Sequence, residues 1–151
     1  MASYKKRNRV VRDTYRILDA NFNRAKEGLR VCEEIARFHL KNKDITKELR
    51  ALRHHLTAIL NASSLDRQLL FKERDAHRDL GKKFTSQNSK NSFKGIFMAN
   101  AQRIKEALRV LEEFLKLLDT TSSKKTQKLR FHFYALEKKT IEKFPALLDS
   151  R

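Results

Sequence analysis

The stretch ANFNRAKEGLRVCEE (residues 20–34) decides the fold, because a near copy of it, ANAQRIKEALRVLEE, recurs at residues 99–113. The two stretches are identical at ten of fifteen aligned positions, which indicates an internal duplication. A weaker likeness follows, in which LRALRHHL from Leu49 aligns at an offset of 80 with LRFHFYAL from Leu129. Because each copy then holds two helical segments, the sequence predicts two related helix pairs that form a pseudo-twofold four-helix bundle.

The composition is that of a helical protein. Only three glycines and one proline occur in 151 residues, whereas Leu, Ala, Lys, Arg and Glu, which favour long helices, fill most of the chain. We therefore predict a single all-α domain, a helical bundle. Repeat A spans about residues 10–61, a crossover with a short helix and a mobile loop spans 62–91, and repeat B spans about 92–144. The expected helix limits are Val10 to Leu40, an N-cap at Asp44 to Asn61, Ser92 to Leu118, and a last helix that begins after DTTSSKK (residues 119–125) and ends at Pro145.

Both copies place polar side chains on the predicted inner face of the first helix of each pair. On a helical wheel these polar groups interrupt an apolar arc that includes Ile17 and Phe38, whereas Glu33 and Glu112 point elsewhere. The polar set is Asn21, Arg24, Glu27, Glu34, Asn100, Arg103, Glu106 and Glu113. Two explanations stay open: the groups form ion pairs that fix the register of the bundle, or they line a pocket that binds phosphate and a metal ion or a heterocycle.

A net charge of +17 suits an anionic partner such as nucleic acid, a membrane surface or a phosphorylated metabolite. Much of this excess is equally consistent with ordinary helix surface. Aromatic residues do not alternate with the basic ones as in a base-stacking platform, so nucleic-acid binding is not favoured. No apolar stretch approaches the length of a membrane span and no secretion signal follows the basic N-terminus, so we expect a cytoplasmic protein without membrane contact.

Several kinds of site are excluded by the sequence. It contains neither GxxxxGK[ST] nor GxGxxG, so phosphate binding would depend on arginine and lysine side chains and helix N-termini. It contains no Glu-x-x-His, which excludes a di-iron bundle site. The single cysteine, Cys32, has no partner for a disulfide and is expected to pack in the core. His54 and His55 are adjacent, so they cannot both face one metal ion.

Four motifs together resemble a known family: ILDANFNRAKEGLRVCEEIARF, LRHHL, RDAHRDLG and ANAQRIKEALRVLEEF. In this order they are similar to the helical module at the N-terminus of some bacterial thiamin-phosphate synthases, here without the synthase barrel. The resemblance covers about Tyr15 to Lys116. It implies a hydroxymethylpyrimidine phosphate kinase, which transfers the γ-phosphoryl group of ATP, with Mg²⁺, to 4-amino-5-hydroxymethyl-2-methylpyrimidine phosphate and so makes the diphosphate.

The residues that match these motifs are the candidate site. We expect Arg24 and Arg103 to bind phosphate oxygens and stabilise the transition state, together with Asp79 as a third catalytic residue. The magnesium ligands expected with ATP are Asp79, Glu27 and Glu106. The expected substrate-binding residues are Asn21, Glu27, Asn100, Glu106, Arg53, His54 and Arg74, the two asparagines pairing with the aminopyrimidine edge. After Gly81 the chain departs from the module, because KKFTSQNSKNSF lacks the expected acidic residue and arginine.

The expected partners are thus the phosphorylated pyrimidine and ATP, with a separate thiamin-phosphate synthase and a second copy of the chain as open options. Two other functions compete with catalysis. One is a non-catalytic module that docks a synthase or carries the pyrimidine phosphate, and the other is a basic helical protein that binds RNA with a steep salt dependence.

Overall fold

The computed structural model describes residues 1–83 and 92–147, and the secondary structure within these ranges is helical with no strand. The long helices are α1 (Ala2–Glu34), α2 (Lys43–Ala62), α4 (Phe93–Leu115) and α5 (Thr120–Lys143). Shorter elements are the π-helical turn η1 (Ile35–His39), α3 (Arg67–Lys72), and the 3₁₀ turns η2 (Leu80–Lys83) and η3 (Pro145–Leu147). The prediction of an all-α bundle is confirmed.

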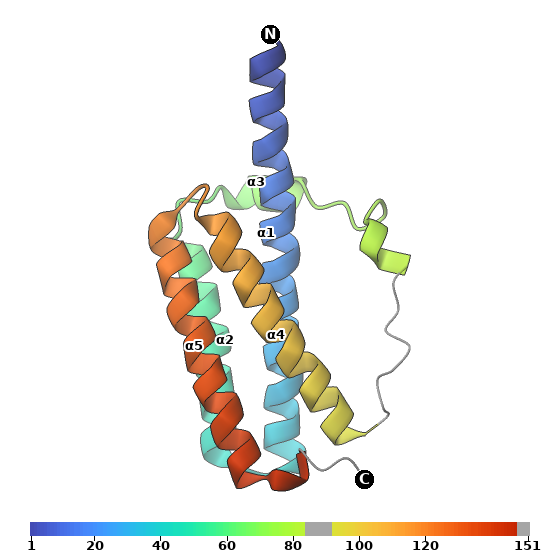
Figure 1. The fold of residues 1–151 in the computed structure, drawn as a ribbon, viewed down its shortest axis with the longest axis vertical. Coiled ribbons are helices and arrows are strands. Elements are labelled where there is room, and N and C mark those ends of the chain that lie inside the picture. The colour runs from blue at the N-terminus through green and yellow to red at the C-terminus, as the bar shows by residue number, and fades with distance from the viewer. Residues whose placement is uncertain (84–91, 148–151) are drawn as a thin grey trace.

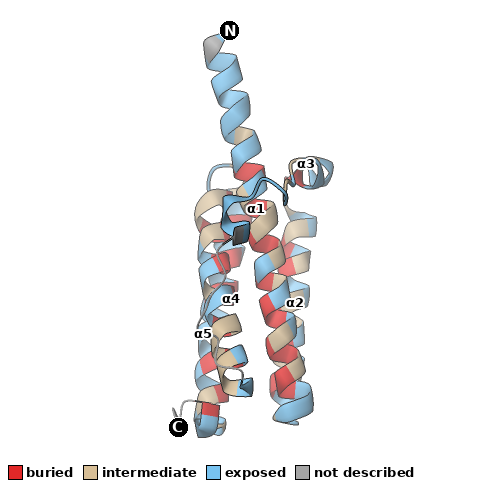
Figure 2. Cartoon of the chain, turned by 90° about the vertical axis from the view of Figure 1, so that its right-hand side faces the viewer, coloured by how far each residue is buried: buried red, intermediate tan, exposed pale blue. Residues whose placement is uncertain are grey.

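Two helical hairpins pack against each other. Helix α1 forms a hairpin with α2, α4 forms one with α5, and the most extensive contact between the hairpins joins α1 to α4 (Figure 1). The first turns of α1 project beyond the other long helices, and their side chains are exposed (Figure 2). None of the helices in the described ranges has the length and apolar composition needed to cross a bilayer.

Helices α2, α3, α4 and α5 begin at polar caps. Asn42 Oδ1 accepts a hydrogen bond from the Ile45 amide at 3.0 Å, and Asp119 Oδ1 accepts one from the Ser122 amide at the same distance. These side chains satisfy amides that the helix itself leaves unpaired. Our prediction of Asp44 as the N-cap of α2 is wrong by two residues, because Asn42 provides the acceptor and Asp44 lies in the first turn. The predicted mobile loop falls mostly on residues 84–91, outside the described residues.

The buried face of α1 is rotated from the one we predicted. Leu18, Phe22 and Leu29 are almost fully buried, whereas Phe38, expected in the core, is 62% exposed. The reason is that α1 packs against α2 as well as α4, which moves the buried arc toward α2. The cysteine prediction is confirmed: Cys32 is buried, and burial raises the pKa of its thiol to about 12.

The buried charged residues of α1 and α4 are Glu33 and Glu112, rather than the predicted arginines. Glu33 accepts a hydrogen bond from Arg53 Nε at 3.0 Å, and Glu112 accepts one from Arg130 Nε at 2.8 Å. The prediction that Glu33 and Glu112 point away from the interior is therefore wrong. Each pair joins the two helices of its own hairpin, where burial makes the loss of one partner costly.

The two hairpins make these contacts at corresponding places. Arg53 and Arg130 are 77 positions apart, whereas our offset of 80 aligned Arg130 with Arg50. The alignment of the second helices was therefore wrong by about one helical turn. The pseudo-twofold symmetry of the two hairpins stays a prediction.

Candidate functional site

Helices α1 and α4 approach closely at Gly28. A Cβ atom added to Gly28 would lie 2.8 Å from Ile104 Cγ1 and 3.2 Å from the carbonyl oxygen of Asn100. A real Cβ would not fit unless the Ile104 side chain or α4 shifted, so glycine allows the two helices to approach this closely. Asn100 and Ile104 belong to the second copy of the repeat and Gly28 to the first, so the two repeated stretches cross at this point.

Polar residues of both repeated stretches lie around this crossing. We use the name crossing face for the set Asn21, Arg24 and Glu27 of α1 with Asn100, Arg103 and Glu106 of α4. Each of these residues lies within about two turns of the closest contact along its helix, because an α-helix rises about 5.4 Å per turn.

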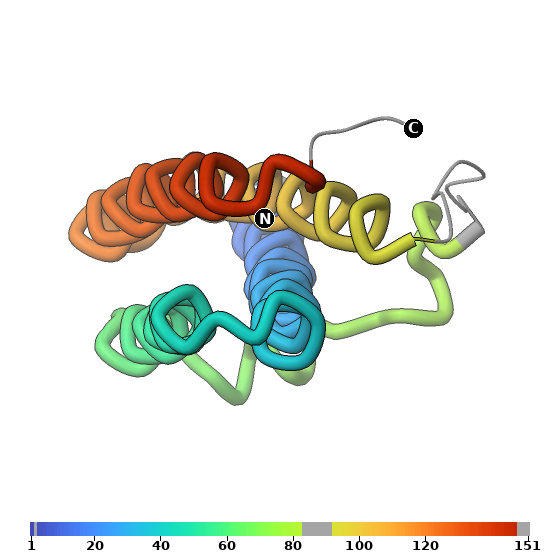
Figure 3. The backbone as a smooth tube through the Cα atoms, turned by 90° about the horizontal axis from the view of Figure 1, so that it is seen from below, coloured from blue at the N-terminus to red at the C-terminus, as the bar shows by residue number. Residues whose placement is uncertain are grey.

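The arginines of the crossing face point away from the hairpin partners. Arg24 and Glu33 are nine residues apart, which is about two and a half turns, so they lie on opposite sides of α1. Since Glu33 faces α2, Arg24 faces away from α2. The same spacing separates Arg103 from Glu112, which faces α5. Both arginines thus lie on the side of α1 and α4 opposite α2 and α5, the side on which residues 73–83 lie (Figure 3).

Our prediction that the whole polar set faces the core is wrong. Arg24, Glu27, Arg103 and Glu106 are exposed, and only Asn21 is buried. The predicted centre of the buried arc lay too close to these residues, because the prediction did not include the arc of α1 that packs against α2. Exposure removes the reason for a purely structural role in register, since an exposed pair contributes little to stability.

The two asparagines make the same local contact. Asn21 Nδ2 donates to the carbonyl oxygen of Ile17 at 2.8 Å, and Asn100 Nδ2 donates to that of Ile96 at 2.8 Å. Because the amide nitrogen is held by its own helix, each side chain offers its oxygen as an acceptor.

The two arginines are free of protein partners within the described part of the chain. Neither Arg24 nor Arg103 forms a hydrogen bond or ion pair there. Glu106 accepts a hydrogen bond from Gln102 at 2.9 Å. Two uncompensated guanidinium groups on one side of a crossing form an electropositive surface that suits phosphate oxygens.

An ion pair connects the crossover to α1 just before the crossing face. Arg74 donates from Nε and from one terminal nitrogen to the two oxygens of Asp19, each at 2.8 Å. This bidentate pair holds the pKa of Arg74 above its usual value, chiefly through the hydrogen bonds to Asp19. Asp19 is five residues before Arg24, about 7.5 Å along the helix. Arg74 therefore positions the crossover rather than presenting a free cation, and sequence reasoning missed Asp19 as its anchor.

Other expected site residues are not brought together. Arg53 is engaged with Glu33, and His54 is exposed on α2, the helix on the other side of α1. Asp79 is exposed and accepts a hydrogen bond from the Gly81 amide at 2.8 Å. In residues 1–83 and 92–147, no group of three or more His, Cys, Asp or Glu side chains converges as a metal site would require. The expected carboxylates thus do not form a metal site of their own.

Comparison with known proteins gives a consistent result. Residues 16–139 match the model of the ThiD2 family. The chain is 38% identical to a thiamine-phosphate synthase of Nostoc punctiforme over 89% of its own length and 37% of the relative's. It is 40% identical to one of Synechocystis over 81% and 34% of the two lengths, and 36% identical to one of Rhodopirellula baltica over 85% and 34%.

The chain spans about a third of the length of these relatives, so what it shares with them is one part of a longer protein. No solved structure matches it. The match to the family model includes both repeated stretches, the crossover residues and most of α5. The chain therefore belongs to the ThiD2 family.

Proposed function

We propose that this protein acts in thiamin biosynthesis and phosphorylates hydroxymethylpyrimidine phosphate to its diphosphate with ATP. The observation that carries the proposal is the pair of unpartnered arginines, Arg24 and Arg103, on the same outer side of the α1 and α4 crossing. Membership of the family and the resemblance of the motifs supply the identity of the substrate.

The reaction needs little acid–base chemistry from the protein. The nucleophile is an oxygen of the pyrimidine's phosphate group, which is already largely deprotonated at neutral pH because the second pKa of a phosphate monoester is about 6. This oxygen forms a bond to the γ-phosphorus as the bond from that phosphorus to the β-γ bridging oxygen breaks, and ADP leaves with the electron pair. Catalysis then depends on holding two highly charged molecules together in line.

The arginines perform that task in the proposal. Two phosphorylated substrates repel each other, and guanidinium groups from two different helices neutralise oxygens on both sides of the transferred group. Gly28 contributes by letting α1 and α4 come close enough for Arg24 and Arg103 to act on one ligand. The ion pair between Arg74 and Asp19 holds this part of the crossover against α1, next to Arg24.

The remaining crossing-face residues recognise the ring and the nucleotide in the proposal. The free acceptor oxygen of Asn21 or Asn100 suits the exocyclic amino group of the aminopyrimidine. Magnesium enters bound to ATP, and since Mg²⁺ usually takes only one or two protein carboxylates beside phosphate oxygens, Asp79, Glu27 and Glu106 stay the candidates to contact it.

A separate thiamine-phosphate synthase is the proposed partner. The relatives that carry this name are about three times the length of the matched part. The diphosphate proposed as the product is the compound that such a synthase would consume.

The test is a reaction of the purified chain with ATP, magnesium and hydroxymethylpyrimidine phosphate, followed by phosphorus NMR. Arg24→Ala and Arg103→Ala are expected to lower turnover by at least about 100-fold each, since one lost electrostatic contact to a transition state costs that much. Lys124→Ala, an exposed change on α5, is the charge-matched control. Turnover that survives in both arginine variants would contradict the proposed site.

A further inference from the structure

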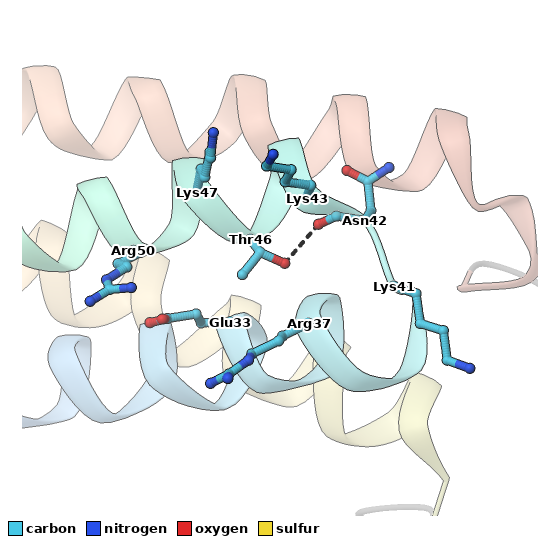
Figure 4. A pocket seen from close by; sticks show the side chains of 8 residues that line it. All are labelled: Glu33, Arg37, Lys41, Asn42, Lys43, Thr46, Lys47 and Arg50. Carbon is cyan, nitrogen blue, oxygen red and sulfur yellow. Dashed lines mark hydrogen bonds between the residues drawn. The ribbon is translucent and has the colours of Figure 1, made fainter.

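A second basic region lies at the other end of the first hairpin, where η1 turns into α2. A pocket of about 420 Å³ opens there between the two elements (Figure 4). It is lined by Glu33, Arg37, Lys41, Asn42, Lys43, Thr46, Lys47 and Arg50. We call it the hairpin pocket. It is separate from the crossing face, because Arg37 is nine residues after Gly28 and lies in η1, beyond the end of α1.

The hairpin pocket has unbalanced positive charge. Five of its eight residues are cations, and within the described part of the chain none of the five is paired with a carboxylate. The one anion in the wall, Glu33, is already shared between Arg53 at 3.0 Å and Arg30 at 3.8 Å. Crowded like charges oppose folding unless an anion compensates them.

The two arginines of the pocket are placed so that an anionic ligand bound between them would supply that compensation. Arg37 extends from η1 and Arg50 from α2, and both side chains flank Glu33 in the space between the helices (Figure 4). The lysine side chains point outward at the rim. Planar guanidinium groups on two sides match the oxygens of a phosphate better than single ammonium charges do. The positive end of the α2 dipole lies at the same place and adds to the attraction.

The second hairpin carries different residues at the positions that correspond to the hairpin pocket. Asn42 and Asp119, the N-caps of α2 and α5, are 77 positions apart, as are Arg53 and Arg130. Asp119 is a built-in anion that accepts from the amides of Ser122 and Ser64, which hold its pKa at about 2.

The positions of the two pocket arginines differ as well. At the offset of 77, Arg50 corresponds to Gln127; at the offset of 79 that relates α1 to α4, Arg37 corresponds to Lys116, which pairs with Glu113 at 3.0 Å. The second hairpin thus has an anionic cap and no arginine at these positions, whereas the first hairpin has a neutral cap, Asp44 in the first turn of α2, and two guanidinium groups.

We infer that the hairpin pocket binds a diphosphate group, with Arg37 and Arg50 as its direct contacts. The ligand is either free inorganic diphosphate or the diphosphate end of a larger metabolite. This inference does not rest on the proposed kinase function, because it uses neither Arg24 nor Arg103.

The test is a titration of the ¹⁵N-labelled full chain with inorganic diphosphate at constant ionic strength. Binding at the hairpin pocket is expected to shift the amide signals of Lys43 to Thr46 in a saturable way. The double variant Arg37→Ala with Arg50→Ala is expected to weaken the affinity by at least about 10-fold, because two charge-assisted contacts are lost. The matched control, Lys125→Ala with Lys128→Ala, removes the same charge from exposed positions of α5 and is expected to leave the affinity within about 2-fold.

The single variant Arg50→Gln keeps the test usable if the double variant does not fold. It introduces the residue that the second hairpin has at the corresponding position, Gln127. Equal weakening by both double variants, or shifts confined to the crossing face, would overturn the inference, since the binding would then be diffuse or elsewhere. A parallel titration with ATP distinguishes free inorganic diphosphate from the diphosphate end of a larger metabolite. Equal affinities for ATP and diphosphate support recognition of the phosphates alone, and a higher affinity for ATP supports a larger metabolite. If the parent chain shows the signal shifts with diphosphate but no kinase turnover, that result would count against the proposed function and not against this inference.

Discussion

Arg130 donates a hydrogen bond from Nε to the Glu112 carboxylate at 2.8 Å, and both residues are buried. The contact joins α5 to α4 within the second hairpin, and it raises the pKa of Arg130 chiefly through that hydrogen bond. A buried ion pair of this kind stabilises weakly as a pair but strongly penalises the loss of one member.

Glu112→Ala is therefore expected to lower the free energy of unfolding by about 3 kcal/mol, because it leaves the Arg130 guanidinium buried without a partner. Replacing both residues, as Glu112→Leu with Arg130→Met, is expected to cost less than the single change. Urea unfolding followed by circular dichroism measures both. A single variant that is as stable as the parent chain would show that Arg130 finds water or another partner.

Gly28→Ala is expected to destabilise the fold by about 1 kcal/mol or more, although alanine is the better helix former. The added Cβ would meet Ile104 Cγ1 at 2.8 Å and the Asn100 carbonyl oxygen at 3.2 Å. The displaced α4 should also lower kinase turnover, because Arg103 moves with it.

Ile104→Ala provides the check on this packing argument. Combined with Gly28→Ala, it removes the clashing side chain, so the double variant should be more stable than the sum of the two single effects predicts. Additive effects would mean that the helices do not meet at Gly28 as closely as described.

Most of the fold could be predicted from the sequence, because helix propensity and the repeat act locally. Helices α2 and α4 appear close to where the pattern places them, and Ser92 caps α4 as a polar residue before an apolar run should. Two starts were predicted too late, because α1 begins at Ala2 rather than Val10 and α5 at Thr120 rather than after DTTSSKK. The direction of the buried face could not be predicted from one helix alone. It depends on which two neighbours α1 contacts, and that is why Arg24 was placed inside and Glu33 outside.

The candidate site was predicted in its residue types but not in its connections. Arg24, Arg103 and the two asparagines follow from the repeated motif itself. The pairing of Arg74 with Asp19 joins residues 55 positions apart, and no local spacing reports such a contact. The hairpin pocket was missed because its basic residues lie in the turn between the predicted helices, where a charge run is ordinarily solvated.

Lys41→Gly is expected to stabilise the chain by about 0.5–1 kcal/mol. Lys41 has φ of 51°, the left-handed region that costs an L-residue with a side chain about 1–2 kcal/mol and that glycine adopts freely. Thermal unfolding measures the change. Lys43→Gly, in the first turn of α2, should instead lower the melting temperature, since glycine weakens a helix.

Asp119 should make stability depend on pH at the acid end. Its pKa is held at about 2, below its ordinary 3.8, mainly by hydrogen bonds from the amides of Ser122 and Ser64. A carboxylate with a lowered folded pKa stabilises above its unfolded pKa, and this contribution is lost as the pH falls from about 4 to about 2.

Asp119→Asn keeps an acceptor at the cap but removes this titration. The stability difference between the parent chain and Asp119→Asn, about 1 kcal/mol at pH 6, should shrink toward zero near pH 2. A difference that stays constant over this range would show that the charge of Asp119 does not contribute.

The most direct test of the central claim is phosphorus NMR of the purified chain with ATP, magnesium and hydroxymethylpyrimidine phosphate. The proposed function predicts diphosphate and ADP signals that grow together in proportion to the protein, and that are lost in Arg24→Ala and Arg103→Ala while both variants still unfold cooperatively. Unchanged substrate signals with the folded parent chain, in the presence of detectable pyrimidine phosphate binding, would contradict catalysis and leave a carrier or docking module in its place.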